Sequence, residues 1–262
     1  MLDETKTPLN LRLSLEDDGD RDVTGVYRRL LQIHDKKDIA PKDIVTREAS
    51  QYIEEKLGQS GYKNIIVAAD SSLVSYEKII NYIDYFESQG YEIHHLNIDY
   101  LAMITKNGVA NTDSLTNIIQ SLFTRIRNVC RRKRILFTTP HQLGAEAKQM
   151  HSQGVANFVK RVAGMSMYDA CKRIDQEVDT EITIHIEKTD SESFLTLQRG
   201  KHRGVDNTPL SHQYCVYKFH PILGLPMDFF GEDESRRSVG GDTESQGGGL
   251  PLWEVDDADF AN

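Results

Sequence analysis

Polar residues follow four apolar stretches of this sequence, and their side chains are of the types that handle phosphate chemistry. They are Glu16, Asp99, Gln142 and the basic pair Lys201 and Arg203. The Glu16 carboxylate can act as a general base on a water molecule, and the Asp99 carboxylate can hold Mg²⁺ through its waters beside a triphosphate. The Gln142 amide can hydrogen-bond a terminal phosphate. The Arg203 guanidinium can reach a neighbouring subunit's nucleotide and stabilise charge during phosphoryl transfer.

Each of these side chains also has a plainer interpretation. Glu16 begins the acidic run Glu16-Asp17-Asp18-Gly19-Asp20, so it can be an ordinary loop acid. Asp99 can be a turn or N-cap residue, and Gln142 can be a polar loop residue. Lys201-His202-Arg203-Gly204 can be a solvated basic turn. Taken one at a time, the four signals are weak.

Hydrophobic periodicity indicates the elements that would position these residues. Strands are expected at residues 9–15, 64–69, 92–98 and 134–139, and helices at 23–34, 43–57, 76–89 and 114–130. This alternation implies a mostly parallel α/β sheet flanked by helices. Ligands bind such sheets at the carboxyl ends of the strands, where Glu16, Asp99 and Gln142 fall. Period-2 stretches at 181–187, 193–198 and 213–219 predict antiparallel strands at the C-terminal edge of the sheet.

The composition is that of a globular protein. Hydrophobic residues make up 39% and charged residues 27% of the 262 residues. There is no apolar run of 18 or more residues, which argues against a membrane partner. The N-terminus does not read as a secretory signal. The three scattered cysteines fit a reducing cytosol, so we expect a cytoplasmic protein.

The charge is unevenly distributed. The net charge of −9 argues at first against nucleic acid as a partner. Residues 231–262 contain nine acids and only two bases, so this segment alone carries −7. With its glycines and few apolar residues it is expected to be a disordered acidic tail, whereas residues 1–230 are expected to form one domain.

Taken together, the order and spacing of the motifs are informative. The motifs are Ser14-Leu15-Glu16, Ile98-Asp99-Tyr100-Leu101, His141-Gln142-Leu143 and Lys201-His202-Arg203-Gly204. This set resembles the RecA-like ATPase domain of DnaB-type replicative DNA helicases over about residues 9–220. The corresponding family segments read Ser-Leu-Glu-Met, Ile-Asp-Tyr-Leu-Gln, Ser-Gln-Leu-Asn-Arg and Lys-Asn-Arg-x-Gly. The short loops and the divergent last motif look like those of phage members.

The resemblance implies specific roles. Glu16 would be the catalytic base, Asp99 the Walker B acid on Mg²⁺, and Gln142 the link between the γ-phosphate and the DNA-binding loops. Lys201 and Arg203 would act in trans as an arginine-finger pair. The cofactors would be ATP or another NTP and Mg²⁺, and the assembly would be a homohexamer around single-stranded DNA.

The family's DNA-contacting loops would correspond here to residues 105–111 and about 144–165. The DNA-binding candidates in these loops are the bases Lys106, Lys148, Lys160 and Arg161. A few bases repeated around a ring would give a positive channel. These residues can also be ordinary surface bases.

One departure from the family bears on activity. The sequence has no G-x-x-x-x-G-K-[ST] motif, the P-loop that cradles the phosphates. We therefore expect the C-terminal part of a helicase motor domain, inactive alone, with its P-loop on a missing or separate segment. The alternative is a catalytically incomplete RecA-like accessory module that binds DNA or replisome proteins. Residues 250–260 mix acids with Trp253 and Phe260, so the tail can bind primase, a helicase loader or another replisome protein, or can simply aid solubility.

Overall fold

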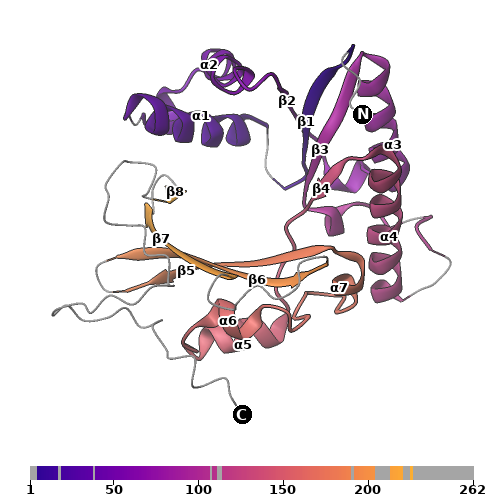
Figure 1. Cartoon of the computed structure of the whole chain (residues 1–262), viewed down its shortest axis with the longest axis vertical. Helices are drawn as coiled ribbons and strands as arrows, with labels where there is room; N and C mark the ends of the chain where they lie inside the picture. The colour runs from indigo at the N-terminus through magenta and orange to yellow at the C-terminus, as the bar shows by residue number, and fades with distance from the viewer. Residues whose placement is uncertain are drawn as a thin grey trace. The chain divides into compact units, whose positions relative to one another are not determined.

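The computed structural model describes residues 5–16, 19–37, 39–106, 108–110, 114–189, 192–203, 213–220 and 225–226 (Figure 1). The chain divides into two compact units, Met1–Gln142 and Leu143–Asn262. This division falls inside the segment 1–230 that was expected to form one domain. The expected boundary at residue 230 and the acidic tail lie outside the described residues.

A four-stranded parallel sheet forms the first unit. Its strands are β1 (Thr7–Ser14), β2 (Lys63–Ala68), β3 (Tyr91–Asp99) and β4 (Leu136–Thr138), in the order β2-β1-β3-β4. Ser14 is level with Ala68 on one side and with Asp99 on the other. The carboxyl ends of three strands are therefore aligned at one edge.

One face of this sheet carries aliphatic side chains that form a buried core. Leu9, Leu11 and Leu13 of β1 are almost completely buried, and so are their β3 neighbours Leu96 and Ile98. The helices α3 (Tyr76–Ser88) and α4 (Leu115–Lys133) lie on this side of the sheet (Figure 1). Strict alternation in β1 sends every second residue to the opposite face, which therefore carries polar side chains.

Local capping chemistry sets the limits of α3, and an ion pair ties α3 to α4. The Ser75 hydroxyl accepts a hydrogen bond from the Lys78 N–H at 3.2 Å and so caps α3. Gly90, just beyond the same helix, has a φ of +88°, a conformation that glycine adopts without strain. Near the end of α4, the Lys133 Nζ lies 2.6 Å from the Glu87 carboxylate, which ties the two helices together.

The helices α1 (Gly19–Asp35) and α2 (Thr46–Gly58) pack on each other and contact β2. The start of α2 differs from the expected Asp43, because Pro41–Asp43 form a short 3₁₀ turn, η1, and Val45 is extended. Two further 3₁₀ turns, η2 (Ser71–Leu73) and η3 (Leu101–Met103), follow β2 and β3.

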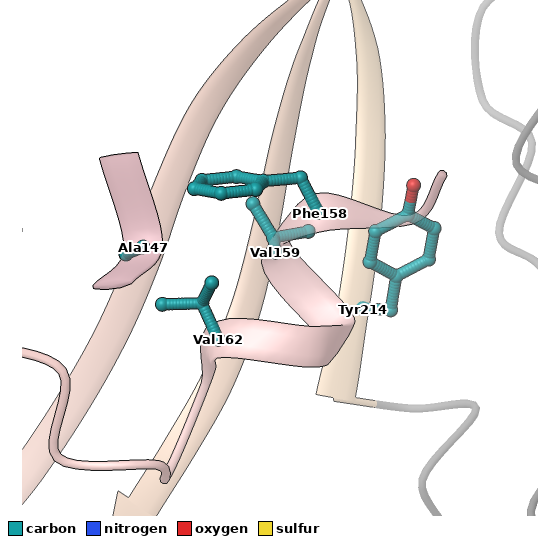
Figure 2. Packing of buried hydrophobic residues seen from close by; sticks show 5 residues of the cluster. All are labelled: Ala147, Phe158, Val159, Val162 and Tyr214. Atoms are coloured by element: carbon teal, nitrogen blue, oxygen red, sulfur yellow. The ribbon is translucent and has the colours of Figure 1, made fainter. Parts of the chain in front are cut away.

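The second unit is an antiparallel sheet with short helices. The strands are β5 (Thr180–Lys188), β6 (Ser193–His202), β7 (Tyr214–His220) and β8 (Leu225–Pro226), paired in chain order. The helices are α5 (Ala145–Ser152), α6 (Phe158–Val162) and α7 (Ile174–Glu177). Figure 2 shows the core between helices and sheet, where Ala147, Phe158, Val159 and Val162 pack with Tyr214.

The α/β fold class is confirmed, with one difference in arrangement. The antiparallel strands were expected at the edge of the parallel sheet, but they form a sheet of their own. A period-2 pattern specifies a strand and its faces, and it does not specify which sheet the strand joins. Within the described part of the chain, no helix is both long and apolar enough to cross a membrane.

Candidate nucleotide-hydrolysis site

The carboxyl ends of β1 and β3 bring Glu16 and Asp99 to one edge of the sheet. The Leu15 N–H donates to the Asp99 carbonyl at 2.8 Å, which extends the pairing of the two strands by one residue. Glu16 follows immediately and is exposed. Two carboxylates separated by 83 positions in sequence thus come from neighbouring strand ends, the arrangement expected for a ligand site in a parallel sheet.

Arg12, in the middle of β1, binds the Asp99 carboxylate. Its Nη2 lies 2.8 Å from Asp99 Oδ2 and 3.0 Å from Asp22 Oδ1 of α1. Its Nε donates to Asp22 Oδ2 at 3.2 Å and its Nη1 to Asn97 Oδ1 at 3.2 Å. One guanidinium therefore joins β1, β3 and α1 and fixes the orientation of Asp99.

Sequence reasoning missed Arg12 and Asp22. The available signal was an arginine flanked by Leu11 and Leu13 in a strand of alternating pattern. A charge on the face of a parallel sheet requires a partner, because such sheets are normally covered on both sides. The identity of the partner could not be read from the sequence, because Asp22 and Asp99 are held there by tertiary structure.

Further polar contacts extend across the same face. The Asn10 side chain donates to Asn64 at 3.0 Å, and the Asn97 amide donates to Thr138 Oγ1 at 2.9 Å. His95 Nε2 lies 2.8 Å from the same hydroxyl, and burial lowers the pKa of His95, which favours the neutral ring. Side-chain hydrogen bonds thus connect each neighbouring pair of strands, β2 with β1, β1 with β3 and β3 with β4.

The segment after β4 carries Gln142 and is held against the end of β3. The Leu101 N–H donates to Thr139 Oγ1 at 3.0 Å. The His141 ring packs edge-on against Tyr100, with ring centres 6.5 Å apart, and against Phe123 at 5.9 Å. Gln142 comes next and is exposed. The ring contact thus places His141, which precedes Gln142, beside Tyr100, which follows Asp99.

Lys201 and Arg203 lie in the second unit, at the end of β6. Arg203 Nη1 is 3.1 Å from Asp179 Oδ1, and its Nη2 donates to the Gln176 carbonyl. The Lys201 ammonium donates to the Asp175 carbonyl. Both basic side chains are therefore engaged by the segment that contains α7 and leads into β5. Gly204 of the same motif lies outside the described residues.

The DNA-binding candidates occupy different environments. Lys106 is half-buried, and its ammonium donates to the Ala102 carbonyl at 3.0 Å. The expected loop at 144–165 contains α5 and α6 instead. On these helices Lys148 and Arg161 are exposed, whereas the Lys160 Nζ lies 4.3 Å from the centre of the Tyr214 ring. Asn107 and residues 111–113 are outside the described part of the first loop.

Comparison with known families identifies the family of this chain. The model of a family described as "Divergent DnaB-like ATPase" matches residues 1–248. The chain belongs to this family.

Solved structures agree with the family at the level of the fold. The chain is similar to a DnaB-like replicative helicase that was studied for its interactions with primase, with 17% identity and a TM-score of 0.59. The match covers 82% of this chain and 49% of that one, so this chain spans about half of the helicase's length. It is also similar to a second solved structure, that of an ATPase domain, with 14% identity and a TM-score of 0.57. That match covers 83% of this chain and 73% of the other. No curated protein matches the chain.

For a member of this DnaB-like family, the residues present fit part of a nucleotide and magnesium site. The Asp99 side chain is 26% exposed, and Arg12 is bonded to one of its oxygens. A carboxylate has about four acceptor positions, so Asp99 can still receive hydrogen bonds from metal-bound waters. Among the described residues, no three His, Cys, Asp or Glu side chains cluster as metal ligands. The remaining acceptor positions of Asp99 thus fit water-mediated contact with Mg²⁺.

Proposed function

We propose that this chain supplies the catalytic-base and Walker B part of a replicative helicase motor. The motor couples NTP hydrolysis to movement along single-stranded DNA and to duplex unwinding. The carrying observation is that Glu16 and Asp99 come from neighbouring strand ends, joined by the 2.8 Å bond from the Leu15 N–H to the Asp99 carbonyl. Family membership over residues 1–248 supports the assignment.

Each site residue has a role in the proposed reaction. Glu16 takes the proton of the attacking water. Asp99 would hold Mg²⁺ through its waters, and the ion would neutralise charge on the β- and γ-phosphates when bound. Gln142 hydrogen-bonds the terminal phosphate and transmits its presence to the following segment. Arg12 orients Asp99 from β1, because its guanidinium is fixed by Asp22 and Asn97.

The phosphate cradle comes from a P-loop segment that is missing or separate. The sequence contains no G-x-x-x-x-G-K-[ST] motif, and backbone N–H groups of that loop carry most of the phosphate contacts. Lys201 and Arg203 act in trans on a neighbouring subunit's nucleotide and exchange their present carbonyl and carboxylate partners for phosphate oxygens. Six copies form the ring, with Lys106, Lys148, Lys160 and Arg161 toward DNA.

The test is a comparison of two variants in the presence of a P-loop segment. The full chain is co-expressed with the candidate P-loop polypeptide, and ATP hydrolysis is measured with Mg²⁺ and single-stranded DNA. Glu16→Gln should lower the turnover about 100- to 10,000-fold, because the general base is lost. Glu48→Gln, on an exposed position of α2, should leave it unchanged. Equal activity of both variants would remove Glu16 from the mechanism.

A second candidate function is an accessory module that binds DNA or replisome proteins without hydrolysis. It is favoured by the Arg12 guanidinium on Asp99 Oδ2, which already supplies one cation to this carboxylate. The two functions differ in one measurement. Hydrolysis by the complex that is lost in Asp99→Asn supports the motor. Single-stranded DNA binding without hydrolysis by any complex supports the accessory module.

A further inference from the structure

One strand of the second unit has its apolar side chains on the open face. Along β5 the exposed positions are Ile182, Ile184 and Ile186, with 56%, 58% and 39% of their surface accessible. The alternate positions include Thr183, which is buried, and His185, whose ring packs 4.8 Å from that of Phe158 in α6. The helices thus cover the more polar side of β5 and leave the isoleucines open.

The neighbouring strands extend this apolar surface. Residues directly opposite one another in an antiparallel pair share a face. Ile184 is opposite Leu197, and Ile186 is opposite Leu195, both on β6. We call Ile182, Ile184, Ile186, Leu195 and Leu197 the isoleucine face. Beyond β6, the face continues to positions 215 and 217 of β7. Contiguous apolar patches on soluble domains mark interaction sites.

The isoleucine face is bordered by positive charge at both ends. Arg199 lies opposite Ile182 in the ladder, and its Nε is buried without a hydrogen-bond partner in the described structure. Lys188 follows Ile186 by two positions on the same side of β5 and is exposed. Among the paired positions described on this face, none is acidic. Two bases on the rim disfavour a second copy and favour an acidic occupant with apolar side chains.

We propose that residues 250–260 of the same chain occupy the isoleucine face. The segment reads Leu-Pro-Leu-Trp-Glu-Val-Asp-Asp-Ala-Asp-Phe, with five large apolar residues, four acids and no base. Its apolar side chains lie on the isoleucines and leucines, and its carboxylates pair with Arg199 and Lys188. The apolar contacts provide most of the affinity, and the charges of Arg199 and Lys188 at the two ends of the face set the position of the segment.

The tether is long enough for this contact. β8 ends at Pro226, and its partner β7 belongs to the same sheet, so the tail leaves from the unit that carries the face. The intervening residues 227–249 include six glycines. A free chain of this length spans about 25 Å on average, close to the ~30 Å length of a nine-residue strand. Tethering of this kind gives an effective concentration of about millimolar, so weak docking suffices.

Trp253 reports on docking in the intact protein, because it is the only tryptophan. In the full chain its emission should be blue-shifted and its iodide quenching reduced relative to the urea-unfolded chain. Ile184→Glu should shift the emission to that of the unfolded chain and restore full quenching. Arg199→Glu should shift it part of the way. The matched control is Leu73→Glu, at an apolar residue that is 68% exposed in the first unit, and it should change neither signal.

Cys215 reports from the other side of the contact. It lies opposite Leu197 on the isoleucine face and is exposed, whereas Cys130 and Cys171 are buried. In the full chain, the double variant Trp253→Ser, Phe260→Ser removes two apolar side chains of the tail. A thiol reagent should label Cys215 several-fold faster in this variant than in the wild type. This measurement leaves the folded sheet unaltered, so it remains decisive if Ile184→Glu fails to fold.

Three results would overturn the proposal. The first is a Trp253 that is as accessible in the wild type as in the unfolded chain. The second is shielding of Trp253 that Ile184→Glu leaves intact, which would place the tail on another surface. The third is shielding that disappears on dilution together with a dimeric mass in sedimentation, which would make a second copy the occupant. Shielding of Trp253 that is independent of protein concentration and is lost in Ile184→Glu supports the proposal.

Discussion

Replacement of Arg12 by alanine should destabilise the first unit more than replacement of the exposed Arg47. The Arg12 side chain is 33% exposed, while Asp22 and Asp99 are 11% and 26% exposed. Its removal leaves two partly buried carboxylates without their cation and one amide oxygen without a donor. Unpaired charges in such positions cost free energy because water cannot fully solvate them.

The expected magnitude follows from the contacts. A hydrogen bond to a charged group contributes about 1.5–3 kcal/mol, and loss of one partner of a buried ion pair costs about 3–5 kcal/mol. Partial exposure lowers these values through solvent screening. We expect Arg12→Ala to lower the free energy of unfolding by about 2–4 kcal/mol. With a urea slope of about 2 kcal/mol per molar, the midpoint falls by about 1–2 M.

The assay is urea unfolding of the full chain, followed by circular dichroism, in a double-mutant cycle. Arg12→Ala, Asp22→Ala and the double variant give a coupling energy, which should be about 1–3 kcal/mol for a direct pair. Arg47→Ala, at an exposed position of α2, is the control and should stay within about 0.5 kcal/mol of wild type. A coupling energy near zero would refute the idea that the ion pair between Arg12 and Asp22 ties α1 to β1.

Three further outcomes can be checked by standard methods. Ser75→Ala should cost about 1 kcal/mol in urea unfolding, because the cap of α3 at 3.2 Å is lost. Val159→Ala, in the core of the second unit, should cost about 2 kcal/mol, whereas the exposed Val45→Ala should cost almost nothing. The pKa of His185 is lowered by burial and by its neighbour His151, so the folded state binds fewer protons than the unfolded state. Stability should therefore fall as the pH drops below about 6.5, and His185→Gln should reduce this fall.

The parallel sheet and the helix caps were predictable because their signals are local. The alternation of leucine and polar residues in β1 specified the buried face, and Leu9, Leu11 and Leu13 occupy it. Ser75 and Gly90 marked the ends of α3 correctly, since a cap depends on a few neighbouring residues. The start of α2 was placed three residues early because Pro41–Asp43 form a separate turn.

Pairing over long distances in sequence was not predictable in the same way. Glu16 and Asp99 were chosen because each follows an apolar strand, and the register of β1 and β3 then brings them together. The Arg12 network depends on contacts that no local pattern encodes. The isoleucine face was also missed, because Ile182, Ile184 and Ile186 alternate as a buried strand does, and only the packing of the helices on the other side shows that they are exposed.

The position of β1 in the middle of its sheet affects how the protein is made. Asn10 of β1 meets Asn64 of β2 across 54 positions, and Arg12 meets Asn97 of β3 across 85. At a synthesis rate of about 5–20 residues per second, β1 leaves the ribosome roughly 3 to 17 s before its partners. During this interval the leucines of β1 have no sheet to join, and they are exposed to chaperones and to other nascent chains. The central strand β1 is therefore synthesised first and stays unpaired until β2 and β3 have been synthesised.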